Sequence, residues 1–224
     1  MSLTRINLTL ALPKIGGAMD AYLREAEDRI ADYQESQRGQ TPSHFVPSDF
    51  LTVFSALSAI RQKGQARGWR FCEWGSGFGV VTGLASMLGF KACGIEIEPD
   101  LVDQASQLAA DFGLNIEFFC GSFIPSGFTL KGTEMETPPD SRPTPALSRD
   151  REQAASTFEE MGLDMKDFDV IYAYPWPGEA LRLEQLFDEV AADGALLVTY
   201  RGIDDVQVHK KQTVAASRKR NRNR

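Results

Sequence analysis

Long apolar segments are missing from this chain of 224 residues. No stretch approaches the roughly 18 consecutive apolar residues that a membrane-spanning helix needs. Residues 1–13 alternate apolar and polar side chains, and they lack the continuous apolar block and small-residue cleavage site of a secretory signal. We therefore expect a cytoplasmic protein that has no membrane partner.

Cysteine and histidine are also scarce. The three cysteines, Cys72, Cys93 and Cys120, show no metal-like spacing, and each lies in a short apolar segment typical of a strand. Reduced, buried thiols are the expectation for such residues. The two histidines, His44 and His209, are too far apart in sequence to form a motif. The sequence therefore predicts no metal site.

Acidic residues are absent from the end of the chain. Residues 210–224 contain seven basic residues and no acidic one, whereas the rest of the chain has 17 basic against 31 acidic residues. An acidic body does not favour a general nucleic-acid surface, so nucleic acid would contact this protein only through the basic tail. A solvated, disordered end is the commoner role of such a tail.

Helix-like and strand-like segments alternate along most of the chain. Apolar residues at helical spacing predict helices at 17–37 and, capped by Ser48 or Asp49, from residue 50 to about residue 60. Strands are then expected at 70–73, 91–96, 115–120, 168–174 and 194–200, and the helices between them at 80–88, 99–112 and 179–191. This alternation predicts an α/β fold with a doubly wound, mostly parallel sheet and helices on both faces.

Residues 125–150 interrupt the alternation. They contain five of the eleven prolines together with threonines and charged residues, a composition that cannot build a packed core. We interpret them as a long, partly disordered insertion, either a lid over a substrate or a passive surface excursion. The expected organisation is an N-terminal helical arm at 1–44, a main domain at 45–209 and the basic tail at 210–224.

The strongest motif joins the first strand of the main domain to its helix: Phe71-Cys72-Glu73-Trp74-Gly75-Ser76-Gly77-Phe78-Gly79. Glycines at alternate positions let the backbone turn sharply and approach a ligand. The N-terminal amides of the following helix are expected to face that ligand. The spacing does not fit the G-x-G-x-x-G pattern of a dinucleotide site. No Gly-Lys-Ser/Thr follows, which excludes a phosphate-binding loop.

A second motif, Gly94-Ile95-Glu96-Ile97-Glu98, ends the next strand. A carboxylate at this place can accept hydrogen bonds from two ribose hydroxyls. Glu96 lies 23 positions after Glu73, close to the roughly 20 expected of a ribose-binding acid. Glu98 is the competing candidate.

The first motif resembles the acidic-x-G-x-G-x-G loop of class I S-adenosylmethionine-dependent methyltransferases, and residues 45–200 look like that superfamily. The resemblance implies S-adenosylmethionine as cofactor, with Glu73 binding the amino end of its methionine moiety. The other residues expected at the cofactor are Gly75, Ser76, Gly77, Gly79, Glu96, Ile97, Ser122, Phe123 and Tyr174. Ser122 replaces an Asp that often binds adenine in the family, and Phe123 would pack on the ring or belong to the core.

The fourth strand ends in Tyr174-Pro175-Trp176-Pro177. Amino-methylating members of the family carry an Asn/Asp-Pro-Pro-aromatic motif here, so Tyr174, Pro175 and Trp176 are the implied acceptor site. An ammonium group could lie against Tyr174 or Trp176 by cation–π attraction. The alternative is a rigid turn before a helix.

Further segments are similar to a small group of protein-lysine methyltransferases that act on an ATP-synthase c subunit. The similarity lies in Val46-Pro47-Ser48, in Glu-x-Gly-Ser-Gly and in Gly-x-Glu-x-Glu-Pro. Phe78 departs from that group, which has a small or acidic residue at its position. The family's sheet also ends in an antiparallel hairpin of two strands, whereas residues 205–209 supply at most one. We expect a truncated sheet, or an edge covered by the N-terminal arm or a second subunit.

The expected function is methyl transfer from S-adenosylmethionine to an unidentified acceptor. A protein lysine or a small molecule is favoured, RNA stays possible, and no general acid or base is evident. The first alternative is a non-catalytic binding or scaffold protein that keeps the fold, because fold alone does not determine function. The second is a nicotinamide oxidoreductase, which the glycine spacing disfavours. The sequence leaves the oligomeric state open.

Overall fold

The computed structural model describes residues 2–11, 14–38, 45–125, 128, 157–202 and 205–212. The predicted insertion therefore lies outside the described residues except for Pro125 and Phe128, and so does the predicted tail after residue 212. Residues 157–161, which precede the fourth predicted strand, are helical.

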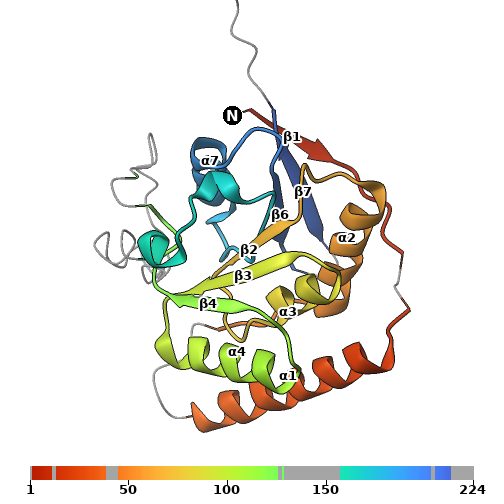
Figure 1. Cartoon of the computed structure of the whole chain (residues 1–224), viewed down its shortest axis with the longest axis vertical. Helices are drawn as coiled ribbons and strands as arrows, with labels where there is room; N and C mark the ends of the chain where they lie inside the picture. The colour runs from red at the N-terminus through yellow and green to blue at the C-terminus, as the bar shows by residue number, and fades with distance from the viewer. Residues whose placement is uncertain are drawn as a thin grey trace, which may run out of the picture.

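One sheet of seven strands forms the centre of the molecule (Figure 1). The strands are β1 (Leu3–Ile6), β2 (Arg70–Trp74), β3 (Lys91–Glu96), β4 (Glu117–Cys120), β5 (Val170–Ala173), β6 (Leu196–Tyr200) and β7 (Val206–Lys211). The helices are α1 (Gly17–Ser36), α2 (Phe50–Lys63), α3 (Val80–Met87), α4 (Pro99–Asp111) and α7 (Ala180–Val190), with a short 3₁₀ helix, η1 (Met165–Asp167), before β5.

The strand order is β1-β7-β6-β5-β2-β3-β4. Strands β2 to β6 are parallel to their neighbours within this set, β7 runs antiparallel to β6, and β1 runs antiparallel to β7. The chain first builds outward from β2 through β3 to β4, then returns to the other side of β2 with β5 and β6. The predicted doubly wound, mostly parallel sheet is confirmed.

The expectation of a truncated sheet is wrong. β7 continues the sheet beyond β6, and β1 from the start of the chain pairs with β7, with Arg5 opposite His209. The N-terminal arm covers the edge of the sheet, which is one of the expected alternatives. β7 also reaches Lys211, so the first two residues of the predicted basic tail belong to the sheet.

A set of hydrogen bonds attaches β1 to the body. The Ser2 amide donates to Asp188 Oδ1 of α7 at 2.9 Å, and the Ser2 hydroxyl donates to the same oxygen at 2.5 Å. The Gln212 amide donates to the Ser2 carbonyl at 2.8 Å. These contacts join residues about two hundred positions apart, which explains why local sequence patterns missed β1.

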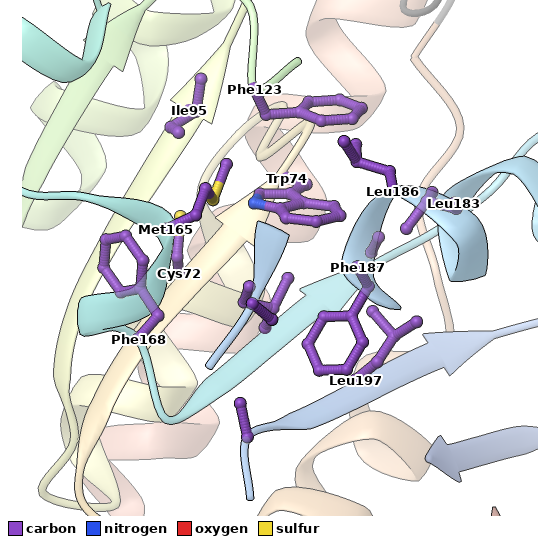
Figure 2. Close-up of a cluster of buried hydrophobic side chains, with 14 of the residues drawn as sticks. Cys72, Trp74, Ile95, Phe123, Met165, Phe168, Leu183, Leu186, Phe187 and Leu197 are labelled. Carbon is purple, nitrogen blue, oxygen red and sulfur yellow. The ribbon is translucent and has the colours of Figure 1, made fainter. Parts of the chain in front are cut away.

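Two apolar layers cover the sheet, because successive strand residues point to opposite faces. Val53 of α2 and Val81 of α3 pack with Phe71 of β2 on one face. Leu183 and its neighbours in α7 pack on the other face, together with Cys72, Trp74 and Leu197 (Figure 2). Figure 1 shows α1 lying beyond α3 and α4, where Tyr22 joins their buried side chains.

Local signals explain where several elements begin. Asp49, rather than Ser48, caps α2: its Oδ1 accepts from the amides of Leu51 at 3.0 Å and Thr52 at 3.1 Å. Pro99 begins α4, where its missing N–H leaves no helical hydrogen bond unmade. Within the described ranges, no helix combines the length and apolar character that crossing a membrane requires.

The cysteines follow the prediction in part. All three thiols are free, and Cys72 and Cys93 are buried opposite each other on β2 and β3. Cys120 is exposed, contrary to the expectation, because it ends β4 at the edge of the sheet. No cluster of three potential metal ligands occurs among the described residues.

Candidate functional site

A cavity of about 770 Å³ lies at the carboxyl ends of β2, β3, β4 and β5. Ligand cavities typically have about 300–1,000 Å³. In open α/β sheets ligands bind at this edge, where the chain turns from one side of the sheet to the other, and here that point lies between β2 and β5. Predicted site residues that line it are Glu73, Gly75, Ser76, Glu96, Ile97, Ser122, Phe123, Tyr174, Pro175 and Trp176.

Glu73 is the next-to-last residue of β2 and is almost fully buried, with 5% of its surface exposed. Its Oε2 accepts hydrogen bonds from the Thr82 amide at 2.8 Å and the Thr82 hydroxyl at 2.5 Å. Burial raises the pKa of Glu73 to about 8; the Thr82 bonds oppose this rise and the nearby charge of Glu96 adds to it. The site therefore holds a carboxyl group that lacks a cationic partner among the described residues.

The bond to Thr82 changes one expectation. Thr82 lies in the first turn of α3, where backbone amides have no partner within the helix. The Glu73 carboxylate accepts the hydrogen bond of one of these amides, that of Thr82. The amides of Gly75 and Ser76 also point inward, to the Ile95 carbonyl at 2.9 and 3.0 Å. The prediction that the N-terminal amides of this helix face a ligand is wrong for the Thr82 amide, because the Glu73 carboxylate already accepts its hydrogen bond. The amides of Gly75 and Ser76 are likewise not available to a ligand.

Glu96 ends β3, next to β2, and is 8% exposed. Its Oε2 accepts from the Gly77 amide at 2.8 Å, and its Oε1 accepts from the amides of Ile97 at 2.7 Å and Glu98 at 3.0 Å. Burial raises the pKa of Glu96, and the three amides partly offset that rise. Glu96 therefore ties the glycine loop to the end of β3, while Glu98 is less enclosed at the same cavity.

Gly77 and Gly79 do not line the cavity but shape its loop. Both have a positive φ, +51° and +67°, a conformation that side chains with a Cβ rarely adopt. A Cβ on Gly77 would lie 2.3 Å from the Phe45 ring, and one on Gly79 would lie 2.4 Å from the Phe118 ring. Glycine is thus required here by close packing as well as by backbone conformation.

Buried polar atoms without partners gather at the cavity. Among the described residues, neither the Ser76 hydroxyl nor the indole N–H of Trp74 has a hydrogen-bond partner. Both residues line the cavity and are at most 4% exposed. Buried polar groups in proteins are nearly always paired, so these two atoms are exceptions that lie beside the cavity without being exposed to it.

The end of β4 contributes Ser122 and Phe123. The Ser122 hydroxyl accepts from the Ile124 amide at 3.2 Å, which leaves its own hydrogen for donation. The Phe123 ring stacks on the Trp74 indole, with centroids 5.2 Å apart and planes inclined by 3° (Figure 2). Phe123 thus belongs both to the core and to the cavity wall, so the two alternatives for this residue are not exclusive.

The end of β5 forms the opposite wall. Tyr174 packs edge-on against Tyr200 at 5.0 Å, and the turn that follows presents Pro175, Trp176 and Pro177 to the cavity. Glu179, at the N-cap of α7, lines the same wall and is 7% exposed.

Phe78, the residue that departs from the lysine-methyltransferase pattern, has a packing role. It is buried between the rings of Phe45, at 5.1 Å, and Tyr33 of α1, at 5.4 Å. Phe45 to Ser48 line the cavity, as does Tyr33. The segment before α2 and the end of α1 therefore close one side of the site over the glycine loop.

Sequence reasoning missed two buried residues of the wall, Tyr172 and Glu179. Tyr172 lies beside Glu73 on the neighbouring strand, and its buried hydroxyl is close to the Ser48 side chain. Burial raises the pKa of Tyr172 and the charge of Glu73 adds to the rise, while the nearby Ser48 side chain lowers it. A polar residue inside an apolar strand could have singled out Tyr172; Glu179 looks like an ordinary helix start.

Comparison with known proteins gives similar solved structures of low sequence identity. No family model matches this sequence, and no curated protein matches it. Similar structures include an RNA methyltransferase from Salinibacter ruber in complex with S-adenosyl-L-homocysteine (TM-score 0.49, 17% identity, covering 77% of this chain and 97% of that one). A methyltransferase from Geobacter sulfurreducens has a TM-score of 0.49 and 12% identity over 90% of this chain and 93% of that one.

A third similar structure is an O-methyltransferase from Bacillus cereus in complex with SAH, with a TM-score of 0.49 and 15% identity over 84% of this chain and 68% of that one. Independently of these, the order of the strands and the antiparallel β6–β7 hairpin are typical of the class I methyltransferase fold. One strand of its usual terminal pair is β7, and β1 takes the place beside it.

Proposed function

We propose that this chain binds S-adenosylmethionine in the cavity at the ends of β2–β5 and transfers its methyl group to an acceptor. One observation carries the proposal: two buried carboxylates, Glu73 and Glu96, end neighbouring strands on either side of a glycine loop and line one cavity. They supply hydrogen-bond acceptors and, once ionised, negative charge, and a cationic nucleoside needs both.

The chemistry of the two carboxylates suits the two ends of this cofactor. Glu73 would bind the positively charged amino group of the methionine end, and that partner would stabilise its buried charge. Glu96 would accept from the ribose hydroxyls. Each carboxylate oxygen has two lone pairs, so the backbone bonds that Glu96 already makes leave further acceptor capacity. After the end of β4, Ser122 and Phe123 would contact the adenine.

The same geometry disfavours a nicotinamide dinucleotide. Dinucleotide folds place the pyrophosphate at the N-terminus of the helix after the first strand. In this chain the carboxylate of Glu73 lies at that helix end and accepts a hydrogen bond from the Thr82 amide. A pyrophosphate there would meet a like charge.

The protein's role in catalysis would be alignment. The cofactor supplies an electrophilic methyl group on a sulfonium, and the reaction is a direct displacement that depends on holding the nucleophile in line. The wall formed by Tyr174, Pro175 and Trp176 follows β5, which pairs with β2, and would position the acceptor. A protein lysine or a small molecule is the favoured acceptor.

Calorimetric titration with S-adenosylhomocysteine (SAH) and with NADH tests the cofactor. We expect binding of SAH only, and a loss of affinity of about tenfold or more, or roughly 1.4 kcal/mol, in Glu73→Gln and in Glu96→Gln. Glu117→Gln is the matched control, because Glu117 is exposed at the start of β4 and does not line the cavity. Unchanged SAH affinity in both cavity variants, or tight NADH binding, would refute the cofactor assignment.

A second experiment separates an enzyme from a binding protein that lacks catalysis. The alternative is favoured by one observation: at the ends of β4 and β5, Ser122 and Tyr174 stand where the family has acidic or amide side chains. Incubation with methyl-labelled cofactor and a cell extract should transfer label to one fraction. Binding of SAH without any transfer of label would support the scaffold role instead.

A further inference from the structure

The groups around Glu73 do not favour its ionisation. Among the described residues, the titratable groups that interact with it electrostatically are Cys72 on its own strand, Glu96 of β3, Tyr172 of β5 and Tyr22 of α1. None of these side chains is a cation at any pH, and the charge of Glu96 adds to the raised pKa of Glu73. A buried carboxylate in such surroundings depends on hydrogen bonds to become charged.

Thr82 supplies those hydrogen bonds. Its amide at 2.8 Å and its hydroxyl at 2.5 Å both donate to Oε2 of Glu73. Each of the two bonds lowers the pKa of Glu73 and so opposes the effect of burial. The amide bond needs only a backbone N–H at this position, whereas the hydroxyl bond needs a threonine or a serine. The residue type at position 82 therefore matters through its hydroxyl.

Both donors act on the same oxygen of the carboxylate. Two donors from different directions fix Oε2 of Glu73, and the plane of the carboxylate is fixed with it. The other oxygen, Oε1, accepts no hydrogen bond from Thr82. Glu73 lines the cavity, whereas Thr82 is fully buried and does not line it. Thr82 can therefore act on a molecule in the cavity only through Glu73.

The helical turn that carries Thr82 is held in place by α1. Tyr22 of α1 is 1% exposed, and its hydroxyl donates to the Gly79 carbonyl at 3.3 Å. Gly83 follows Thr82, and a Cβ on Gly83 would collide with the Tyr22 hydroxyl. The Gly83 amide donates to the same Gly79 carbonyl at 2.9 Å. The packing of α1 thus fixes the start of α3, and with it the two donors that face Glu73.

We propose that Thr82 is a positioning residue for the cofactor. Its hydroxyl promotes ionisation of the Glu73 carboxylate and leaves Oε1 to the amino group of the methionine moiety. This inference rests on the proposed function and deepens it. It gives a role in cofactor binding to a residue that touches neither the cofactor nor the acceptor.

Loss of the hydroxyl should move the ionisation of Glu73 to higher pH. A hydrogen bond to a charged group changes such an equilibrium by about tenfold, which corresponds to about one pH unit. Because the pKa of Glu73 is about 8, the ionised fraction at pH 7 should fall about tenfold in Thr82→Val, and SAH affinity should fall with it. At about pH 9.5 the carboxylate is mostly charged with or without the hydroxyl, so the two affinities should converge.

Calorimetric titration of the full-length protein with SAH at pH 7 and at about pH 9.5 tests the inference. Thr82→Val keeps the branched shape of the side chain without its hydroxyl, and should bind about tenfold more weakly at pH 7 but within about twofold of wild type at the higher pH. Thr82→Ser keeps the hydroxyl and should stay within about threefold at both. Thr199→Val is the matched control, because Thr199 of β6 is equally buried and does not line the cavity; it should change neither affinity.

A second arm needs no ligand. NMR of the protein with isotope-labelled glutamate carboxyl groups follows the titration of Glu73, whose signal is the one missing in Glu73→Gln. Its midpoint should lie about one pH unit higher in Thr82→Val than in wild type and stay in place in Thr82→Ser. Thr82→Ala removes the same hydroxyl if Thr82→Val does not fold.

The outcomes separate the inference from the proposed function. An unshifted midpoint, or a loss of SAH affinity that is equal at both pH values, would overturn the role of Thr82 while the cofactor assignment stands. An equal loss is what a packing defect alone would cause. A wild-type protein that does not bind SAH would instead refute the proposed function itself, whatever the midpoint of Glu73.

Discussion

Affinity for SAH should depend steeply on pH because of Glu73. In the free protein, burial raises the pKa of this carboxyl to about 8. SAH presents a protonated amino group but no sulfonium, so its one cationic group is the group assigned to Glu73. If binding requires the charged carboxylate, the pKa falls in the complex, and affinity must rise as pH rises towards 8.

The size of the effect follows from the ionised fraction. With a pKa of about 8, Glu73 is about 1% ionised at pH 6 and half ionised at pH 8, so affinity should increase by roughly 50-fold over this range. At pH 7 each binding event should release nearly one proton. Titrations in phosphate and in Tris, whose ionisation enthalpies differ, measure that proton directly.

Glu73→Gln removes the titrating group and should abolish most of the pH dependence. Glu117→Gln should retain it, since this exposed residue lies away from the cavity. A wild-type affinity that changes less than about threefold between pH 6 and pH 8, or the absence of proton release at pH 7, would refute the reasoning. The same slope in Glu73→Gln would show that another group titrates.

The remaining predictions concern stability and assembly. Gly77→Ala should lower the free energy of unfolding by about 1–3 kcal/mol more than Gly64→Ala does. Both glycines have a positive φ, but only at Gly77 would a new Cβ meet the Phe45 ring. Urea denaturation measures the difference, and equal losses would contradict the prediction. Asp49→Ala should cost about 1 kcal/mol through loss of the α2 cap, by the same assay. Removal of residues 2–11 should expose the edge of β7 and promote self-association in light scattering, and a stable monomer would argue against that role for β1.

Much of the site could be predicted because its residues follow strand ends. Glu73, Glu96, Ser122 and Tyr174 each come at or just after the end of a predicted parallel strand, and the structure brings them to one cavity. Parallel strands share the edge at which they end, so a correct list of strands already predicts which residues meet. Their roles at a cofactor stay predictions.

Hydrogen-bond partners could not be predicted in this way. Whether the amides of Gly75 and Thr82 face a ligand or the protein depends on the carboxylate and carbonyl groups beside them. Those groups are brought close by the pairing of β2 with β3 and by the packing of α3. The role of Phe78 likewise depends on Tyr33 of α1, whose contact with the loop no spacing rule indicates.

The sequence by itself determined most of the elements from α1 to β6, their alternation and the spacing of the two acidic motifs, because periodicity and glycine positions act over a few residues. Tertiary structure alone decided that β1 completes the sheet beside β7 and that Glu179 joins the cavity wall. Such contacts depend on which surfaces can be buried together, and this is a property of the folded chain rather than of any short segment.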